Sequence, residues 1–408
     1  MTEQPVLQLI HISDLHVKNE QHAVSPKDLS LMRRLRKIDQ RSAQLSKLLP
    51  KMLAPRLIER AQEMVRGLEN GMFGHAPSAL DRFSDFVRAV TSNDAKWKGV
   101  PTCLIDTGDL TTFGDKASLT EGHDFLNQLS GLCDSTVSVY GNHDAWPTMQ
   151  PIFAKREEIA AHRKELREDV YSYTAPSDPL EINLPGGEAR IAVYRLNSVL
   201  HDRFRNTLAL GEIQHDRYWE KQDFPHPGEQ IQKLLEDAVD REENGRSLRI
   251  VLSHHPIYEP GHFDYRLSMR LINDSEVFKI LGKAPKGLSI NQLAHLVMSG
   301  HTHELFPAQG ELSGEPVSPA QLVVGSLSKQ YAYQFSNFAT SHKPDKALHQ
   351  SYNSQYPHQC ELLRFYYNPG NPNQIRLDRL VAARAYGSGP FLLLRKNGRI
   401  AESMHLDF

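Results

Sequence analysis

The chain has 408 residues, 39% of them hydrophobic, and a formal net charge of −2 at pH 7. This composition suits a globular protein of one large domain or two modest ones. The near-neutral charge gives no general attraction to nucleic acid or anionic lipid, because proteins that bind either usually carry a marked basic excess. We therefore expect no stable nucleic-acid complex.

The cysteines and the hydropathy pattern exclude further classes. The three cysteines, Cys103, Cys133 and Cys360, form no CxxC pair, so neither a disulfide framework nor a thiolate zinc site is indicated. No apolar run approaches the roughly 18 residues that a membrane-spanning helix needs, and the first residues lack the features of a signal peptide. We expect a cytoplasmic protein without a transmembrane segment.

Short apolar runs that end in turn-type residues recur along the chain, as is typical of buried strands. In chain order these predicted strands are 6–12, 102–106, 136–140, 190–196, 248–252, 293–298 and 321–324. Helical periodicity lies between several of them, at 78–90 and 229–239. Strands that alternate with helices predict an α/β protein with much parallel pairing.

The pattern changes after about residue 355. Three further strands are predicted at 360–367, 374–382 and 391–395, and the turn sequences NPGNPN and GSGP separate them. Short strands joined by such turns are typical of antiparallel pairing.

Five short blocks of metal-ligand residues come directly after five of the predicted strands. They read Asp14-Leu15-His16, Gly108-Asp109, Gly141-Asn142-His143-Asp144, His254-His255-Pro256 and Gly300-His301-Thr302-His303. Carboxylate oxygens and imidazoles are common ligands of first-row metals. Because ligands of open α/β sheets bind outside the carboxyl ends of the strands, the five blocks can converge on one crevice and hold two ions.

Each block alone is open to a plainer interpretation. Asp-x-His and Gly-Asp are common turns, and Asp106 and Asp115 compete with Asp109 for any ligand role. Asn142 could coordinate through its carbonyl oxygen and leave His143 free to act on substrate, with Asp144 available to fix the tautomer of His143 or raise its basicity. The five blocks together favour one bimetallic site.

In this order the blocks resemble the motifs D-x-H, GD, GNH(D/E), H and GHxH of the calcineurin-like metallophosphoesterase superfamily, and all five match without substitution. The resemblance implies an α/β fold, a four-layer sandwich of two mixed β-sheets flanked by helices, in a single domain spanning 1–408. Within it we expect a helical insert at 17–77 after the first strand. We also expect 355–408 to complete or cap the second sheet.

The resemblance also implies ligand sets for two divalent or trivalent metal ions. The first set is Asp14, His16, His303 and the bridging Asp109. The second set is Asn142, His254, His301 and the same Asp109. The choice of His254 over His255 rests on the H-x-P spacing of the family. Oxygen and imidazole ligands fit manganese, iron or zinc.

The reaction implied is hydrolysis of a phosphoester, with a phosphodiester of a small molecule or nucleotide as the expected substrate. Two cations would polarise the phosphoryl oxygens and activate a water for in-line attack. His143 would lie beside the scissile phosphate as a general acid, and Asp144 is the second residue expected to act in catalysis.

Three long segments leave directly from the blocks, at 17–77, 145–188 and 257–290, and we interpret them as walls or lids. The first contains a helical stripe with a basic side, which suggests a lid over an anionic ligand or a peripheral membrane contact. A helical hairpin that packs on its own domain explains the same pattern. The residues expected to contact substrate are Arg203, Arg205, His262 and Arg266.

Three other functions are compatible with parts of this pattern. A DNA or RNA nuclease could use the same five blocks, although the chain has no basic excess. A lipid-linked pyrophosphatase would use the insert as an interfacial helix. A non-catalytic scaffold on the same fold should have lost ligands, and no ligand is missing here. The sequence does not fix the oligomeric state.

Overall fold

The computed structural model describes a little over half of the chain. The described residues are 3–17, 76–92, 94–112, 114–145, 179–187, 189–199, 211, 213, 227–243, 246–257, 271, 274–284, 286, 288–303, 305–306, 309–312, 315–328, 356–385, 389–394 and 401–408. Almost all of the expected insert at 17–77 lies outside this part, as do most of the segment 145–188 and half of the segment 257–290.

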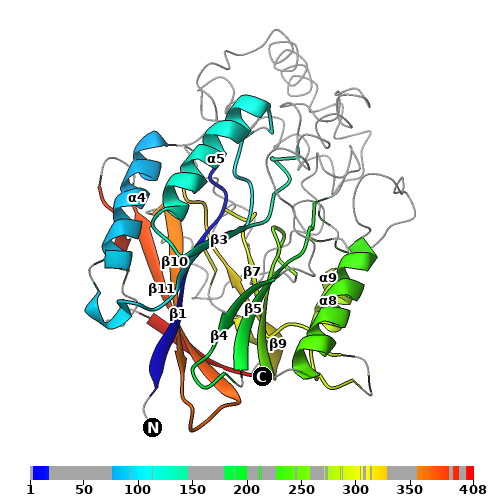
Figure 1. Ribbon diagram of the computed structural model, residues 1–408. Helices are drawn as coiled ribbons and strands as arrows, with labels where there is room; N and C mark the ends of the chain where they lie inside the picture. The colour runs from blue at the N-terminus through cyan, green and yellow to red at the C-terminus, as the bar shows by residue number, and fades with distance from the viewer. Residues whose placement is uncertain are drawn as a thin grey trace, which may run out of the picture.

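Two mixed β-sheets form the centre of the molecule (Figure 1). The strands of the first sheet are β1 Gln4–Ile12, β2 Thr102–Asp106, β3 Ser135–Ser138, β10 His358–Tyr367, β11 Gln374–Arg384, β12 Leu392–Leu393 and β13 Ala401–Asp407. The strands of the second are β4 Leu180–Asn183, β5 Ala189–Arg195, β6 Arg246–Leu252, β7 Leu296–Ser299, β8 Gln309–Leu312 and β9 Glu315–Val323. Within the described residues the strand orders are β12-β11-β10-β1-β2-β3, with β13 also on β11, and β4-β5-β6-β7-β9-β8.

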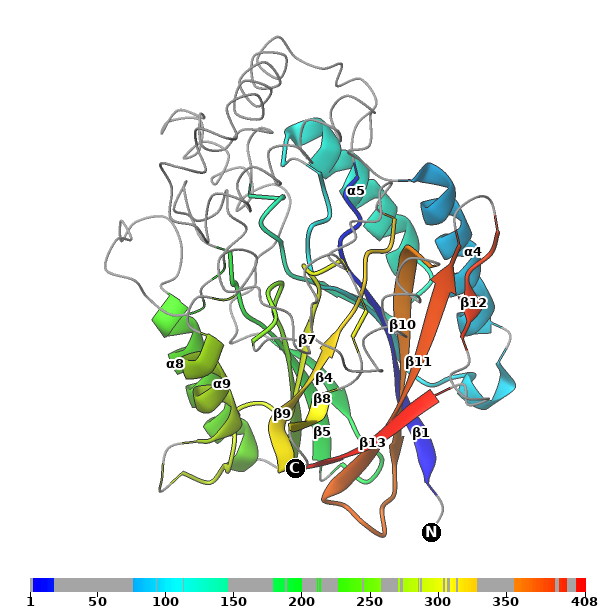
Figure 2. The ribbon, with the colours of Figure 1, turned by 180° about the vertical axis from the view of Figure 1, so that it is seen from behind.

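Helices cover the outer face of each sheet. The helices are α4 Pro77–Ser92, the 3₁₀ helix η1 Ala95–Trp97, α5 Lys116–Ser130, α8 Pro227–Glu243 and α9 Asp274–Gly282. Figures 1 and 2 show α4 and α5 on the side of the first sheet and α8 and α9 on the side of the second. Phe83 of α4 and Leu126 of α5 share one buried cluster with β1, and Leu234 of α8 and Val277 of α9 share another with β5 and β6. The expected four-layer α/β sandwich is confirmed.

Parallel pairing brings strand ends to the same edge. β1, β2 and β3 are parallel neighbours, and so are β5, β6, β7 and β9. A third buried cluster fills the space between the sheets, with Leu9 and Ile105 from the first sheet and Ile250 and Met298 from the second. Because this layer is tightly packed, it fixes the relation between the strand ends of the two sheets.

The C-terminal segment differs from our expectation. We expected 355–408 to complete or cap the second sheet, but β10 pairs antiparallel with β1, and β11 pairs with β10, so the segment extends the first sheet. The strand β1 has β2 on one side only, and its other edge receives β10. Strand order along the chain does not determine which open edge a later strand joins, because sequential strands are not always neighbours in a sheet.

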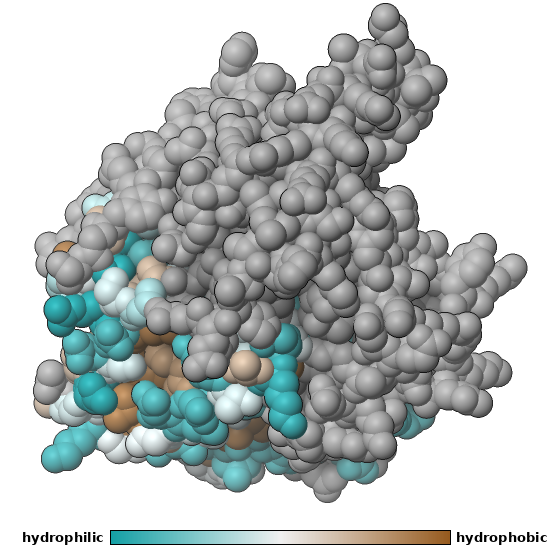
Figure 3. Space-filling view, turned by 90° about the horizontal axis from the view of Figure 1, so that it is seen from above, coloured by the Kyte–Doolittle hydropathy of each residue, from teal (hydrophilic) through white to brown (hydrophobic). Residues whose placement is uncertain are grey.

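None of the helices in the described part of the chain combines the length and apolar character that crossing a bilayer requires. Where described residues are visible from above, hydrophilic residues predominate, with hydrophobic ones between them (Figure 3).

A row of ionisable side chains crosses the first sheet within the layer between the sheets. His11 Nδ1 lies 2.8 Å from Glu361 Oε2, and Arg379 Nε lies 2.7 Å from Glu361 Oε1. Arg379 also reaches Glu402 at 3.2 Å, on the neighbouring strand β13. Glu361 is fully buried. Burial alone would raise the pKa of Glu361, but Arg379 and His11 outweigh it and the pKa is lowered.

Replacement of Glu361 by Gln should lower the free energy of unfolding by about 3–5 kcal/mol, because it leaves the Arg379 charge buried without its partner. Urea unfolding at pH 7 measures this. Since the folded pKa of Glu361 is lowered, its stabilising effect is present above the unfolded pKa of about 4.3 and is lost as the pH falls through the folded value. The difference between wild type and variant should therefore narrow in acid.

Glu402→Gln is the matched control, because Glu402 meets the same guanidinium but its side chain is 38% exposed. An exposed ion pair contributes about 1 kcal/mol or less. Equal losses for Glu361→Gln and Glu402→Gln would contradict the assignment of Glu361 as the central charge of the row.

Candidate metal centre

The five ligand blocks meet at one edge of the two sheets. They follow β1, β2 and β3 in the first sheet and β6 and β7 in the second, as expected from the sequence. The described residues contain two groups of potential metal ligands, and within each group the ligand atoms all lie within 4.8 Å of one another. The first group is Asp14, His16, Asp109 and His303, and the second is Asp109, His254 and His301.

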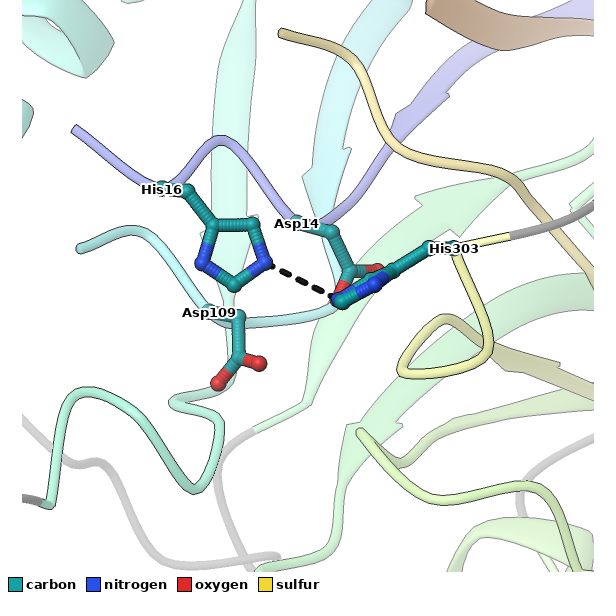
Figure 4. A group of neighbouring side chains, drawn as sticks. All are labelled: Asp14, His16, Asp109 and His303. Atoms are coloured by element: carbon teal, nitrogen blue, oxygen red, sulfur yellow. Dashed lines mark hydrogen bonds and ion pairs between the residues drawn. The ribbon is translucent and has the colours of Figure 1, made fainter. Parts of the chain in front are cut away.

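The first group lies on the loops after β1, β2 and β7 (Figure 4). His16 Nε2 and His303 Nε2 are 2.9 Å apart. Asp14 Oδ1 is 3.0 Å from His303 Nε2 and 3.8 Å from His16 Nε2. One carboxylate oxygen and two ring nitrogens therefore converge on one point.

The second group is built around His254. Its Nε2 lies 3.0 Å from Asn142 Oδ1, 3.0 Å from His301 Nδ1 and 3.5 Å from Asp109 Oδ2. Its Nδ1 lies 2.8 Å from the carbonyl oxygen of Thr107, which fixes the ring so that Nε2 faces the group. The amide oxygen of Asn142 thus lies beside the carboxylate and imidazoles of the second group.

These residues fit metal ions. Asp14 Oδ1 and Asp109 Oδ2 are buried and accept no hydrogen bond, which is costly for carboxylate oxygens that no cation approaches. Two ring nitrogens at about 3 Å either share one proton in a hydrogen bond or, when both are unprotonated, can coordinate the same ion. Atoms that share one first-row ion at about 2.0–2.2 Å lie roughly 3–3.5 Å from one another. The observed spacings run from 2.9 to 3.8 Å, close to this range.

The backbone of the ligand loops is strained. Among the described non-glycine residues, positive φ angles fall on Asp14 at 55°, His16 at 53°, Asp109 at 53°, His301 at 67° and His303 at 56°. All five belong to the two ligand groups. This left-handed conformation costs roughly 1–2 kcal/mol for each such residue. It persists only where the surroundings over-determine it, which is a property of functional sites.

Asp109 is the electrostatic centre of the site. Burial would raise its pKa, but attraction by His254 and then His143 outweighs burial, and the pKa lies well below its usual value. For His254 burial would lower the pKa, yet Asp109 raises it to about 9. Burial lowers the pKa of His16 and His301 well below the usual range, so these imidazoles are neutral at pH 7, as ligation requires.

Two glycines allow the loops to approach closely. A Cβ atom on Gly141 would lie 2.1 Å from Asp109 Oδ1 and 2.4 Å from the Asp109 backbone nitrogen. A Cβ atom on Gly300 would lie 1.8 Å from Ser13 Oγ and 2.7 Å from Asp14 Oδ2. Both positions therefore exclude any side chain.

Gly141→Ala should displace Asp109 and reduce metal content and turnover together, because contacts this short cannot be accommodated without movement of the carboxylate. Metal analysis of the purified variant checks this, with an expected loss in affinity of at least about 10- to 100-fold. Gly131→Ala is the control, since its nearest neighbour would lie at 3.5 Å and its φ is −66°. Equal metal content in both variants would show that Gly141 is not required.

His143 differs from the ligands in its contacts. Its backbone nitrogen donates to Asp109 Oδ1 at 2.8 Å, and its Nδ1 lies 2.8 Å from the carbonyl oxygen of Thr112. Because a carbonyl only accepts, Nδ1 carries a proton. Its Nε2 is 4.0 Å from Asp109 Oδ2, and the side chain is 17% exposed whereas that of Asp109 is buried. His143 is in neither ligand group.

The contacts of Asp144 differ from those expected. Its carboxylate accepts from the backbone nitrogens of Thr111 at 2.8 Å, Gly141 at 2.9 Å and Leu110 at 3.2 Å, and from the Thr111 hydroxyl at 2.9 Å. The tautomer of His143, which we expected Asp144 to fix, is set by the Thr112 carbonyl instead. Burial, and then repulsion from Asp109, raise the pKa of Asp144 to about 6. Asp144 joins the loops after β2 and β3.

The competing residues of the sequence have other roles. His255 Nδ1 lies 2.9 Å from Ser198 Oγ, and the centroid of its ring lies 4.2 Å from that of the His301 ring. Asp115 is the N-cap of α5. Asp106 Oδ1 accepts from the Gly108 backbone nitrogen at 3.1 Å. Each of the three lies outside both ligand groups.

The sequence did not point to Thr107 and Thr112, whose backbone carbonyls orient His254 and His143. A carbonyl is present in every residue, so these roles carry no signal in the sequence. The four residues expected to contact substrate, Arg203, Arg205, His262 and Arg266, lie outside the described residues, and they stay predictions.

Comparison with known proteins gives one family match. A family model described as calcineurin-like phosphoesterase matches residues 7–305, which include all five blocks. No curated protein matches the chain. Among solved structures, 25 chains match. One is the purple acid phosphatase PPD1 from yellow lupin (Lupinus luteus) seeds, at 11% identity and a TM-score of 0.44, with 100% of this chain and 54% of that one covered. The chain thus spans about half the length of that structure.

Proposed function

The chain belongs to the calcineurin-like phosphoesterase family, and we propose that it is a metal-dependent hydrolase that cleaves a phosphodiester of a small molecule or nucleotide. The observation that carries the proposal is that two ligand groups share Asp109, with His143 bonded to the same carboxylate through its backbone nitrogen. This arrangement combines two cation sites with one imidazole that is not a ligand.

We propose that Asp14, His16, Asp109 and His303 hold one ion and that Asp109, Asn142, His254 and His301 hold the other. Two bound ions would supply Lewis acidity to the phosphoryl oxygens and acidify a water for in-line attack. The donor set of carboxylates, one amide and imidazoles suits manganese, iron or zinc. Asp109 belongs to both groups, so it would bridge the two ions and lower their mutual repulsion.

The second element of the mechanism is His143. Its Nδ1–H is anchored on the Thr112 carbonyl, so the ring has one fixed orientation. We propose that Nε2 holds the proton that the leaving oxygen receives, which is a general-acid role. The partial exposure of this side chain, beside buried ligands, is what contact with a substrate requires.

The proposal is tested by comparing hydrolysis of bis-4-nitrophenyl phosphate with that of 4-nitrophenyl phosphate, with manganese, iron or zinc added to metal-depleted protein. We expect metal-dependent turnover with preference for the diester. Preference for the monoester would make the protein a phosphatase. If the protein binds none of these metals and hydrolyses neither ester, a non-catalytic scaffold is the correct interpretation.

We also propose a cytoplasmic location, since the cysteines of the chain form no disulfide. Cell fractionation with a tagged protein tests it, and recovery in a secreted or periplasmic fraction would contradict it.

A further inference from the structure

Three consecutive carbonyl oxygens in the first ligand loop each accept a hydrogen bond from a side-chain hydroxyl. Ser326 Oγ donates to the Asp14 carbonyl at 2.7 Å, and Thr112 Oγ1 donates to the His16 carbonyl at 2.5 Å. Between them, Ser328 Oγ donates to the Leu15 carbonyl. All three hydroxyl residues are buried. We call Thr112, Ser326 and Ser328 the hydroxyl clamp.

The clamp reaches the loop from both sheets. Thr112 follows β2 of the first sheet, and its backbone nitrogen donates to the Val17 carbonyl at 2.9 Å. Ser326 and Ser328 follow β9 of the second sheet, and alternate residues of an extended segment face the same side. Between the two serines, the Leu327 backbone nitrogen donates to the Ser13 carbonyl at 3.0 Å.

The opposite polar groups of the loop are also paired. The backbone nitrogens of Asp14 and His16 donate to the carbonyls of Gly108 at 2.8 Å and Asp109 at 3.0 Å. The loop after β2 therefore holds the N–H groups, and the clamp holds the carbonyls. Together they can hold Asp14 and His16 at φ angles of 55° and 53°, which non-glycine residues seldom adopt.

We propose that Thr112, Ser326 and Ser328 are positioning residues that hold Asp14 and His16 in the geometry of metal ligands. The proposal rests on the proposed function, in which these two residues bind one of two ions. Ser326 and Ser328 lie beyond residues 7–305, which the family model matches. Without a clamp hydroxyl, a buried carbonyl loses its donor and the strained loop is free to relax away from the ligand geometry.

The test is equilibrium binding of Mn²⁺ alone to metal-depleted protein. The electron paramagnetic resonance signal of the free ion measures how much Mn²⁺ stays unbound. For wild type we expect two ions bound per chain. Ser326→Ala, Ser328→Ala and Thr112→Val should each weaken one of the two sites by about 10- to 100-fold, the effect typical of groups that orient a ligand. The second site should change less.

Two controls separate the clamp from general effects. Thr112→Ser keeps the hydroxyl and should retain Mn²⁺ affinity, whereas Thr112→Val keeps the volume and should lose it. Thr91→Val removes a hydroxyl that donates to the Val87 carbonyl at 2.9 Å within α4, and it should not change Mn²⁺ binding.

Thermal unfolding with and without Mn²⁺ distinguishes positioning from stability alone. A hydroxyl that only stabilises the fold would lower Tm equally in both conditions, whereas a positioning hydroxyl would reduce the rise in Tm that Mn²⁺ causes. Wild-type Mn²⁺ affinity in all three clamp variants would overturn this inference and leave the proposed function intact. Absence of any Mn²⁺, iron or zinc binding by the wild type would overturn both.

Discussion

Asp109→Asn is expected to remove both metal ions and nearly all turnover. Among the described residues, Asp109 is the one that belongs to both ligand groups. It is buried and its pKa is well below the usual value, so it carries the negative charge that two neighbouring cations need. An amide of the same shape offers no such charge. We expect kcat to fall by about 10⁴-fold or more, as when one member of a cooperating catalytic unit is lost.

Metal analysis and kcat measured on the same preparation test this prediction. Asp106→Asn is the matched control, because Asp106 is also buried and lies three positions earlier, yet belongs to neither group. Burial, followed by repulsion from Asp144, raises its pKa well above the usual value, so a neutral amide is a close substitute. An Asp109→Asn protein that retains two ions would rule out Asp109 as the bridge.

The main sheet architecture could be predicted because the buried strands are short apolar runs that end in turn residues. The five blocks then fell at strand ends, where parallel pairing makes carboxyl ends neighbours. Strands β4, β8 and β13 were not predicted. All three lie at sheet margins, where one side of the strand does not need to be apolar.

Helix α5 was not predicted, for a different reason. Gly122 lies in its middle, and glycine is unfavourable in a helix. The structure explains the glycine, because a Cβ atom there would lie 2.7 Å from the side chain of Leu110. Leu110 directly follows Asp109, so this glycine lets α5 pack against the loop that carries the shared ligand. Packing overrode local preference here.

The ligand residues could be identified from the sequence, but the groups that orient them could not. His254 and His143 are oriented by backbone carbonyls of Thr107 and Thr112, which have no characteristic side chain. The positive φ angles of Asp14 and His303 are likewise imposed by tertiary contacts, since neither residue type requires them. Sequence adjacency does not reveal which way two side chains point, so the bonds of the Asp144 carboxylate to the backbone nitrogens of Leu110, Thr111 and Gly141 could not be predicted.

His143→Ala is expected to keep both metal ions and to lower kcat by about 10²- to 10⁴-fold, the usual contribution of general acid–base catalysis. The contact of residue 143 with Asp109 is made by its backbone nitrogen, which alanine preserves, so the ligand groups remain in place. The imidazole is lost together with its bond to the Thr112 carbonyl, its contact with the His16 ring and its attraction to Asp109. The exposed His405→Ala serves as the control, with unchanged kcat and metal content.

The leaving group tells whether the lost imidazole acted as an acid. A nitrophenolate leaves readily without a proton, whereas an alkoxide does not, so a general acid matters more for the alkoxide. The loss in kcat for His143→Ala should therefore be greater with a dialkyl phosphate, whose leaving group is an alkoxide, than with bis-4-nitrophenyl phosphate. Equal losses would assign His143 to stabilising charge on the phosphoryl oxygens, and unchanged kcat with full metal content would exclude it from the reaction.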